Sequence, residues 1–123
     1  MAEYAQWAKL DGGPLHISAD GGKTGIALFQ ASPGHPARKL EMGVAFRVDA
    51  ETFIGFASSL AEAGLLQPTG EPLEIGSIVD FDLCYAYNFQ DPYGNQLELD
   101  CYDYATVKRE FVENQGLTPV RYC

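Results

Sequence analysis

The most regular pattern in the chain is a pair of alternating segments joined by a short turn. Residues 83–89 and 96–102 alternate between apolar and polar positions, which is typical of β-strands that bury one face. Between them, Pro92 fixes its own φ angle and Gly94 tolerates positive φ, so the chain can reverse direction sharply. The pattern therefore predicts an antiparallel hairpin.

The hairpin has two chemically different faces if Phe89 lies opposite Leu97, because successive side chains of a strand point to opposite sides. The apolar face then comprises Leu83, Tyr85, Tyr87, Phe89, Leu97, Leu99 and Cys101. The other face is small and polar and comprises Cys84, Ala86, Asn88, Glu98, Asp100 and Tyr102. We expect a helix to cover the apolar face, and we expect the function to depend on what Glu98 contacts.

Weaker patterns predict the remaining elements. The predicted strands lie at 4–10, 15–18, 24–30, 43–48 and 75–82, and the predicted helices at 50–63 and 104–115. The first three strands form a meander with glycine-rich turns. Asp49 and Asp103 are the expected N-caps of the two helices, and Gly64 and Gly116 are the residues at which the helices end.

The length of 123 residues and the apolar content of 46% fit a single domain with an ordinary core. We expect three strands in 1–31 and a proline-containing linker in 32–41. A strand, a helix and three further strands follow in 42–102, and a helix and tail in 103–123. The predicted class is therefore α+β.

The net charge of the chain restricts the kinds of molecule that it can bind. Eight basic and seventeen acidic residues give a net charge of −9, which repels nucleic acid and anionic membranes and favours cationic or neutral partners. The alternative is that the acidic surface only keeps the protein soluble. The chain opens with no signal-like leader and has no run of membrane-spanning length, so we expect a cytoplasmic protein.

The three cysteines indicate neither a disulfide framework nor a structural zinc site. Cys84, Cys101 and Cys123 are an odd number and lack CxxC or Cys/His spacing. No histidine is close to any of them in the sequence, and a catalytic thiol needs a base. We therefore expect Cys84 and Cys101 to be packing residues in strands.

Three segments together resemble a known superfamily. They are Gly43-Val-Ala-Phe-Arg-Val-Asp49, Glu62-Ala-Gly64 and Asp91-Pro-Tyr-Gly-Asn-Gln-Leu-Glu-Leu99. In this order they resemble the vicinal oxygen chelate superfamily, which includes glyoxalases, bleomycin resistance proteins and extradiol dioxygenases. The resemblance implies paired βαβββ modules whose curled mixed sheet forms a cup.

The resemblance also implies that the first module lacks its opening strand and helix. One account is that a partner chain completes the cup. The other is that residues 107–122 resemble the missing helix and the turn after it, so that the chain is circularly permuted. Both accounts predict a homodimer or a higher assembly, with or without exchanged elements.

In metal-dependent members of the superfamily, histidines and glutamates of the cup bind one divalent ion. Glu98 matches the glutamate of the last strand, so it is the candidate metal ligand. Gly43 stands where the second module usually has a histidine, and Ala27 is nearest to the position of the first module's carboxylate. The ligand set is incomplete, so we expect no cofactor and keep a divalent metal as the alternative.

Other side chains are candidates for contact with a small molecule. Arg47 shares the cup-facing side of its strand and can pair with Glu98, with Asp100 or with an anionic ligand group. The candidate ligand-binding residues are Glu98, Arg47, Asn88, Tyr102, Trp7, Phe29 and His16. Each has an ordinary alternative: a hydrogen bond of Glu98 to Asn88 or Tyr102, a surface ion pair for Arg47, core packing for the aromatic residues, and a solvated ring for His16.

Three classes of function remain. The first is a metal-free protein that binds a cationic or aromatic small molecule in a cup completed by dimerisation, as the drug-sequestering members of the superfamily do. The second is a metal-dependent lyase or dioxygenase. The third is a structural or interaction module that uses the incomplete cup as a contact edge. Whether the protein is an enzyme therefore stays open at this stage.

Overall fold

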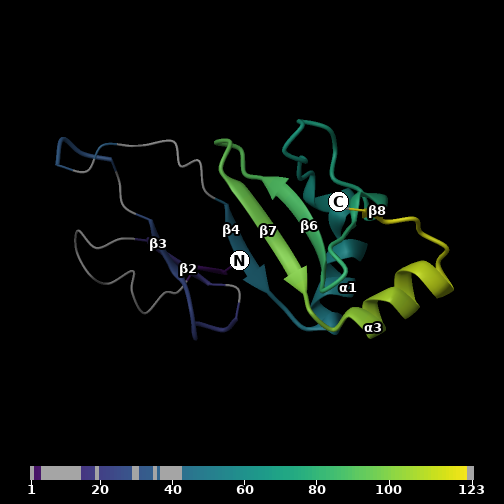
Figure 1. Ribbon diagram of the computed structural model, residues 1–123. Helices are drawn as coiled ribbons and strands as arrows, with labels where there is room; N and C mark the ends of the chain where they lie inside the picture. The colour runs from purple at the N-terminus through teal and green to yellow at the C-terminus, as the bar shows by residue number, and fades with distance from the viewer. Residues whose placement is uncertain are drawn as a thin grey trace. The chain divides into compact units, whose positions relative to one another are not determined.

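The computed structural model describes residues 2–3, 15–18, 20–28, 31–34, 36 and 43–121 (Figure 1). For residues 2–3, 15–17 and 28 only the backbone is described. The chain divides into two compact units, Met1–Lys39 and Leu40–Cys123. No helix within the described ranges is long and apolar enough to cross a membrane.

The first unit contains a three-stranded antiparallel sheet in the order β1-β2-β3. The strands are β1 (Ala2–Glu3), β2 (Leu15–Ser18) and β3 (Ile26–Leu28). The strand predicted at 15–18 is confirmed, and β3 lies within the one predicted at 24–30. The strand predicted at 4–10 lies outside the described residues.

The turn between β2 and β3 is held by hydrogen bonds to Asp20. The amide and hydroxyl of Thr24 donate to its two carboxylate oxygens over 2.9 and 2.6 Å. These bonds favour the ionised form and lower the pKa of Asp20 to about 2. Gly21 and Gly22 have φ angles of 73° and 85°, as a glycine-rich turn requires.

The second unit contains a mixed five-stranded sheet in the order β4-β7-β6-β5-β8 (Figure 1). Its strands are β4 (Val44–Arg47), β5 (Val79–Asp80), β6 (Tyr85–Gln90), β7 (Gln96–Cys101) and β8 (Val120–Arg121). β4 runs parallel to β7 and β8 runs parallel to β5, whereas β6 is antiparallel to both of its neighbours. The predicted α+β class is confirmed at this level.

The hairpin has the predicted register, with Phe89 opposite Leu97. At its corner, Asp91 accepts hydrogen bonds from the amides of Tyr93 and Asn95 over 2.9 and 2.8 Å, and Gly94 has a φ angle of 84°. The side chain of Asp91 therefore stabilises the turn that sets the register of β6 and β7.

The first helical segment also begins and ends where predicted. Asp49 caps α1 (Ala50–Ser58) by accepting from the amide of Thr52 over 2.8 Å. α2 (Leu60–Ala63) follows after a break at Ser59 and ends at Gly64, whose φ angle of 64° is left-handed. In Figure 1, α1 passes behind the strands and covers one face of the sheet.

Aromatic side chains dominate the core between this helix and the sheet. The rings of Phe53 and Tyr87 stack with centroids 5.2 Å apart, and Phe56 contacts Tyr87 and Phe89 at 5.9 and 5.6 Å. The buried hydroxyl of Tyr87 donates to the carbonyl of Ile75 over 2.7 Å. The predicted apolar face is thus buried at Tyr85, Tyr87, Phe89, Leu99 and Cys101.

The C-terminal helix packs on the same core. It consists of α3 (Tyr104–Lys108), capped by Asp103, and a π-helical segment (Arg109–Asn114). Val107 and Phe111 are buried, and the Phe111 ring lies 6.1 Å from that of Phe53. These contacts lie within the second unit.

A two-residue strand after this helix was not predicted. β8 pairs with β5, and the guanidinium of Arg121 lies 3.7 Å from Asp80 and 2.6 Å from Asp82. The hydroxyl of Tyr104 also donates to Asp80, over 2.9 Å. The buried carboxylate of Asp80 thus joins α3 and β8 to the sheet.

Two predictions around β5 are wrong. The strand predicted at 75–82 is reduced to Val79–Asp80, because Ile75–Ser77 forms a 3₁₀ turn closed by hydrogen bonds between Glu74 and Ser77. Leu83 was assigned to the apolar face but is 74% exposed. It lies in the tight turn before β6, where Asp82 has a φ angle of 66° and its amide donates to Asp80 over 2.8 Å.

Candidate ligand-binding face

The sheet of the second unit has one face that α1 does not cover, and the predicted polar residues lie on it. We call this the cup face and define it by Ala45, Arg47, Ala86, Asn88, Glu98, Asp100 and Tyr102. The register places Glu98 between Ala45 and Asn88, and Asp100 between Arg47 and Ala86. The structure therefore brings together four of the predicted ligand-binding residues: Arg47, Asn88, Glu98 and Tyr102.

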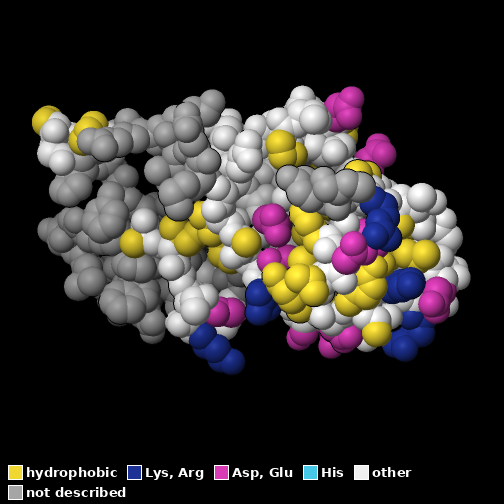
Figure 2. All heavy atoms as spheres, viewed as in Figure 1, with side chains coloured by type: hydrophobic (Ala, Val, Ile, Leu, Met, Phe, Trp, Pro, Cys, Tyr) yellow, Lys and Arg dark blue, Asp and Glu magenta, His cyan; other side chains and the backbone are white. Residues whose placement is uncertain are grey.

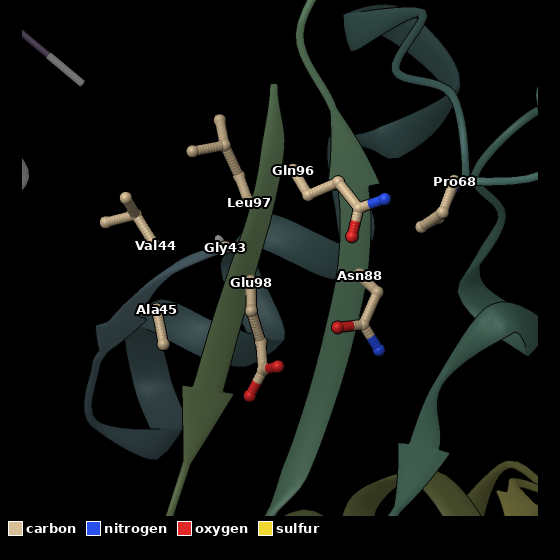
Figure 3. A pocket seen from close by; sticks show the side chains of 8 residues that line it. All are labelled: Gly43, Val44, Ala45, Pro68, Asn88, Gln96, Leu97 and Glu98. Atoms are coloured by element: carbon tan, nitrogen blue, oxygen red, sulfur yellow. The ribbon is translucent and has the colours of Figure 1, made fainter. Parts of the chain in front are cut away.

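One end of the cup face is hollow (Figure 3). The space measures about 150 Å³ and is lined by Gly43, Val44, Ala45, Pro68, Asn88, Gln96, Leu97 and Glu98. In Figure 3, the side chains of Glu98 and Asn88 project from neighbouring strands toward the same side. Since liquid water takes about 30 Å³ per molecule, the hollow has room for about five waters or one small chemical group.

The carboxylate of Glu98 lies in this hollow and forms no side-chain hydrogen bond with a described residue. The predicted alternatives, a bond to Asn88 or to Tyr102, are therefore not formed. Burial disfavours the charged carboxylate and raises the pKa of Glu98, and the nearby charge of Asp100 raises it further. A positively charged neighbour would therefore stabilise the ionised form of Glu98.

Asp100 lies more deeply in the same face, next to Arg47. The guanidinium Nε of Arg47 is 3.8 Å from the Asp100 Oδ1, and the side chain of Asp100 is only 10% exposed. That distance exceeds the range of a hydrogen bond, and the buried Oδ1 has no hydrogen-bond partner in the described structure. Burial raises the pKa of Asp100, although the charge of Arg47 opposes this.

Arg47 and Tyr102 form the third part of the cup face. The guanidinium carbon lies 3.8 Å from the centroid of the Tyr102 ring, which is the geometry of a cation–π contact. Arg47 is 67% exposed and Tyr102 is 47% exposed. Of the two carboxylates predicted to pair with Arg47, Asp100 is the one that forms the ion pair.

Cys84 and Cys101 are both buried, and Cys101 lies in β7 as predicted, whereas Cys84 lies just before β6 and not in a strand. Burial raises the pKa of the Cys84 thiol, and the charge of Asp100 raises it further. The same desolvation raises the pKa of Cys101. Neither thiol is therefore activated as a nucleophile, because the thiolate is the reactive form.

The remaining candidate residues belong to the first unit. His16 lies in β2 opposite Ala27, but its side chain is not described. Trp7 and Phe29 lie outside the described residues. Within the described ranges, no group of three or more histidine, cysteine, aspartate or glutamate side chains could hold a metal ion.

Two residues that line the hollow, Pro68 and Gln96, were not predicted from the sequence. Pro68 comes from the loop after α2, which reaches the sheet through a hydrogen bond of 2.9 Å from the Gln90 amide to the Leu66 carbonyl. Gln96 lines the hollow from the start of β7. The loop has no periodic pattern that ties it to a strand far away in the sequence, so no local signal could have placed Pro68 there.

No family model matches this chain, and neither a search of curated proteins nor a search of solved structures finds a match. The resemblance to the vicinal oxygen chelate superfamily therefore stays a hypothesis. It rests on the residues quoted above and on the order of elements from β4 to β7.

Proposed function

We propose that this protein binds a small cationic or aromatic molecule on the cup face, in the manner of the glyoxalase and bleomycin-resistance type of protein. The observation that carries the proposal is the pair of carboxylates Glu98 and Asp100: the buried Oδ1 of Asp100 has no hydrogen-bond partner among the described residues, and burial raises the pKa of both groups. A cationic group beside them would stabilise both ionised forms.

The charges of the cup face favour a cationic ligand in particular. Glu98 and Asp100 contribute two negative charges, and Arg47, which is mostly exposed, contributes one positive charge. The chain as a whole carries a net charge of −9, which attracts cations over longer distances. Figure 2 shows acidic side chains among apolar ones on the visible face of the second unit, a mixture that suits a cationic molecule with an apolar body.

The hollow is large enough for only part of a drug-sized ligand. Pockets for whole drug-sized ligands measure about 300–1,000 Å³, whereas this one measures about 150 Å³. It therefore fits one head group, and the rest of the ligand needs a second surface. We propose that a second copy of the chain supplies that surface, since β4 is the terminal strand of the described five-stranded sheet.

The element order supports the proposed relationship. A strand, two short helices and three strands follow one another from β4 to β7, and they form the sheet order β4-β7-β6-β5. This is the βαβββ arrangement that the resemblance implies for the second module. Whether the first unit is the remainder of another such module belongs to the same hypothesis.

The experiment that tests the function is calorimetric titration of the full chain with ethidium, using phenanthridine as a neutral aromatic probe for comparison. We expect ethidium to bind and phenanthridine to bind at least about tenfold more weakly, because only ethidium carries a positive charge that a carboxylate attracts. Glu98→Gln should weaken ethidium binding by a similar factor. Glu113→Gln removes an exposed carboxylate of the C-terminal helix and should leave binding unchanged. Equal binding by wild type and Glu98→Gln would contradict the proposal.

A second titration separates the alternative functions. Metal-stripped protein is titrated with Zn²⁺, Ni²⁺, Mn²⁺ and anaerobic Fe²⁺. Tight uptake of about one ion per chain, lost in Glu98→Gln, would favour a metal-dependent lyase or dioxygenase instead. Binding of neither metal nor cation would favour an interaction module, and sedimentation of the protein with and without ethidium would show whether a dimer forms.

A further inference from the structure

The contact between Arg47 and Tyr102 suggests a more specific role for the cup face. Arg47 extends from β4, and Asp100 lies directly opposite on β7. The guanidinium carbon of Arg47 lies over the Tyr102 ring, 3.8 Å from the ring centroid. The chain thus places one of its own cations where an aromatic surface and a buried carboxylate meet.

Arg47 does not provide the hydrogen bond that the buried carboxylate of Asp100 lacks. The Arg47 Nε is 3.8 Å from the Asp100 Oδ1, too far for a hydrogen bond, and that oxygen is buried without a hydrogen-bond partner in the described residues. Buried carboxylate oxygens normally accept hydrogen bonds, so the oxygen is an open acceptor. A donor that came about 1 Å closer would complete it.

The exposures of Asp100 and Arg47 show which of the two side chains can move. Asp100 is 10% exposed and therefore fixed by its surroundings, whereas Arg47 is 67% exposed. Arginine is long and rich in rotamers, and an exposed ion pair or cation–π contact holds it only weakly. Arg47 can therefore leave the ring of Tyr102 without disturbing the core.

The charge balance allows a second cation to take its place. Glu98 and Asp100 carry two negative charges on neighbouring positions of one face of β7, and Arg47 neutralises one of them. With a ligand cation at Asp100 and Arg47 still on the same face, two positive charges balance the two carboxylates. An anionic ligand group would meet two carboxylates and one arginine, which disfavours it.

We propose that Arg47 is a displaceable internal cation, and that Tyr102 and Asp100 form a subsite for the guanidinium group of a ligand. The inference rests on the proposed function and names the ligand class. A guanidinium group is planar, so it stacks on the ring, and it carries N–H donors for the open oxygen of Asp100. A quaternary ammonium group could stack but could not donate.

The test uses NMR titration of the full chain with phenylguanidinium, and phenylurea serves as the neutral probe of the same shape. We expect phenylguanidinium to shift the Arg47 Nε–H resonance as the guanidinium leaves the ring, and phenylurea to leave it in place. Arg47→Ala should bind phenylguanidinium about three- to tenfold more tightly than wild type, because the internal competitor is gone. Arg109→Ala removes an exposed arginine of the C-terminal helix and should have no effect.

Two further variants test the partners of the cation. Tyr102→Leu should weaken phenylguanidinium binding about three- to fivefold through loss of the ring. Asp100→Asn should weaken it by at least about tenfold. If Asp100→Asn does not fold, as judged by its amide spectrum, Tyr102→Leu and Arg47→Ala still decide the matter.

The outcomes separate this inference from the proposed function. If ethidium binding depends on Glu98 but Arg47→Ala binds phenylguanidinium no more tightly than wild type, the inference is overturned and the proposed function stands. If neither ethidium nor phenylguanidinium shifts any cup-face resonance of wild type or Arg47→Ala, both are overturned. An unmoved Arg47 Nε–H signal at saturating phenylguanidinium also overturns the inference.

Discussion

At the scale of the residue, the same chemical group behaves in opposite ways in different parts of this chain. Hydrogen bonds from Thr24 lower the pKa of Asp20, and hydrogen bonds from Thr52 lower the pKa of Asp49. Burial raises the pKa of Glu98 and of Asp100. The first two carboxylates stabilise a turn and a helix, whereas the cup-face carboxylates are costly to the fold. Groups that cost stability without structural need are typical of functional sites.

This difference leads to a prediction about pH. The pKa of Glu98 is raised in the folded state, so the folded protein binds a proton more readily than the unfolded chain, and stability falls as pH rises above the ordinary value of 4.5. Glu98→Gln should therefore increase the free energy of unfolding at pH 7.5, by less than about 1 kcal/mol because water screens the group. The gain should vanish below pH 4.5. Urea unfolding at pH 7.5 and pH 4 measures both, and a less stable variant at pH 7.5 would contradict the prediction.

A second prediction concerns the two faces of the hairpin. Leu99 is 8% exposed and packs in the core, whereas Leu83 is 74% exposed in the turn before β6. Leu99→Ala should lower the free energy of unfolding by about 2–5 kcal/mol through lost burial and the cavity left behind. Leu83→Ala is the matched control and should change it by less than about 0.5 kcal/mol. Urea unfolding compares the two, and similar losses would mean that the turn is packed.

At the scale of the element, single residues determine where each helix begins and ends. Asp49 and Asp103 cap helices through their carboxylates, and Gly64 and Gly116 end them with positive φ angles of 64° and 72°. These features are local, so the sequence was sufficient to predict them. β5 is shorter than predicted because hydrogen bonds between Glu74 and Ser77 close a 3₁₀ turn over part of the predicted strand, a feature that is local as well but that the alternation of apolar residues does not reveal.

Two glycine substitutions test how the first helical segment is defined. A Cβ atom would meet nothing within 4 Å at either Gly55 or Gly64. Gly64→Ala should nevertheless destabilise the protein by about 1 kcal/mol, because its backbone is left-handed. Gly55→Ala lies inside α1 and should stabilise it by about 0.5–1 kcal/mol. Melting temperatures of the two variants should therefore move in opposite directions, and a stabilising Gly64→Ala would show that the helix end can rearrange.

At the scale of the whole molecule, the described core belongs to one unit. All of its buried residues lie between Ala50 and Phe111, and its ring contacts join α1, β6 and the π-helical segment. Asp80 adds α3 and β8 to the same sheet through Tyr104 and Arg121. The second unit, Leu40–Cys123, thus has the features of an independently folding body.

We therefore expect a fragment of residues 40–123 to fold alone. It should show one cooperative thermal transition, together with a near-ultraviolet circular dichroism signal from the packed rings of Tyr85, Tyr87 and Tyr104. A fragment with helical far-ultraviolet signal but no near-ultraviolet signal would contradict the prediction, because it would mean that the core needs residues 1–39. The full chain measured under the same conditions is the control.

The sequence by itself determined the hairpin register, the helix caps and the side of β7 on which Glu98 lies. These features follow from alternation and from the residues that tolerate turns, both of which act over a few positions. The tertiary structure alone decided that β8 pairs with β5, that Pro68 lines the hollow, and that Asp100 keeps a buried oxygen without a hydrogen bond. Each of these depends on segments far apart in the chain, and such contacts have no periodic pattern in the sequence.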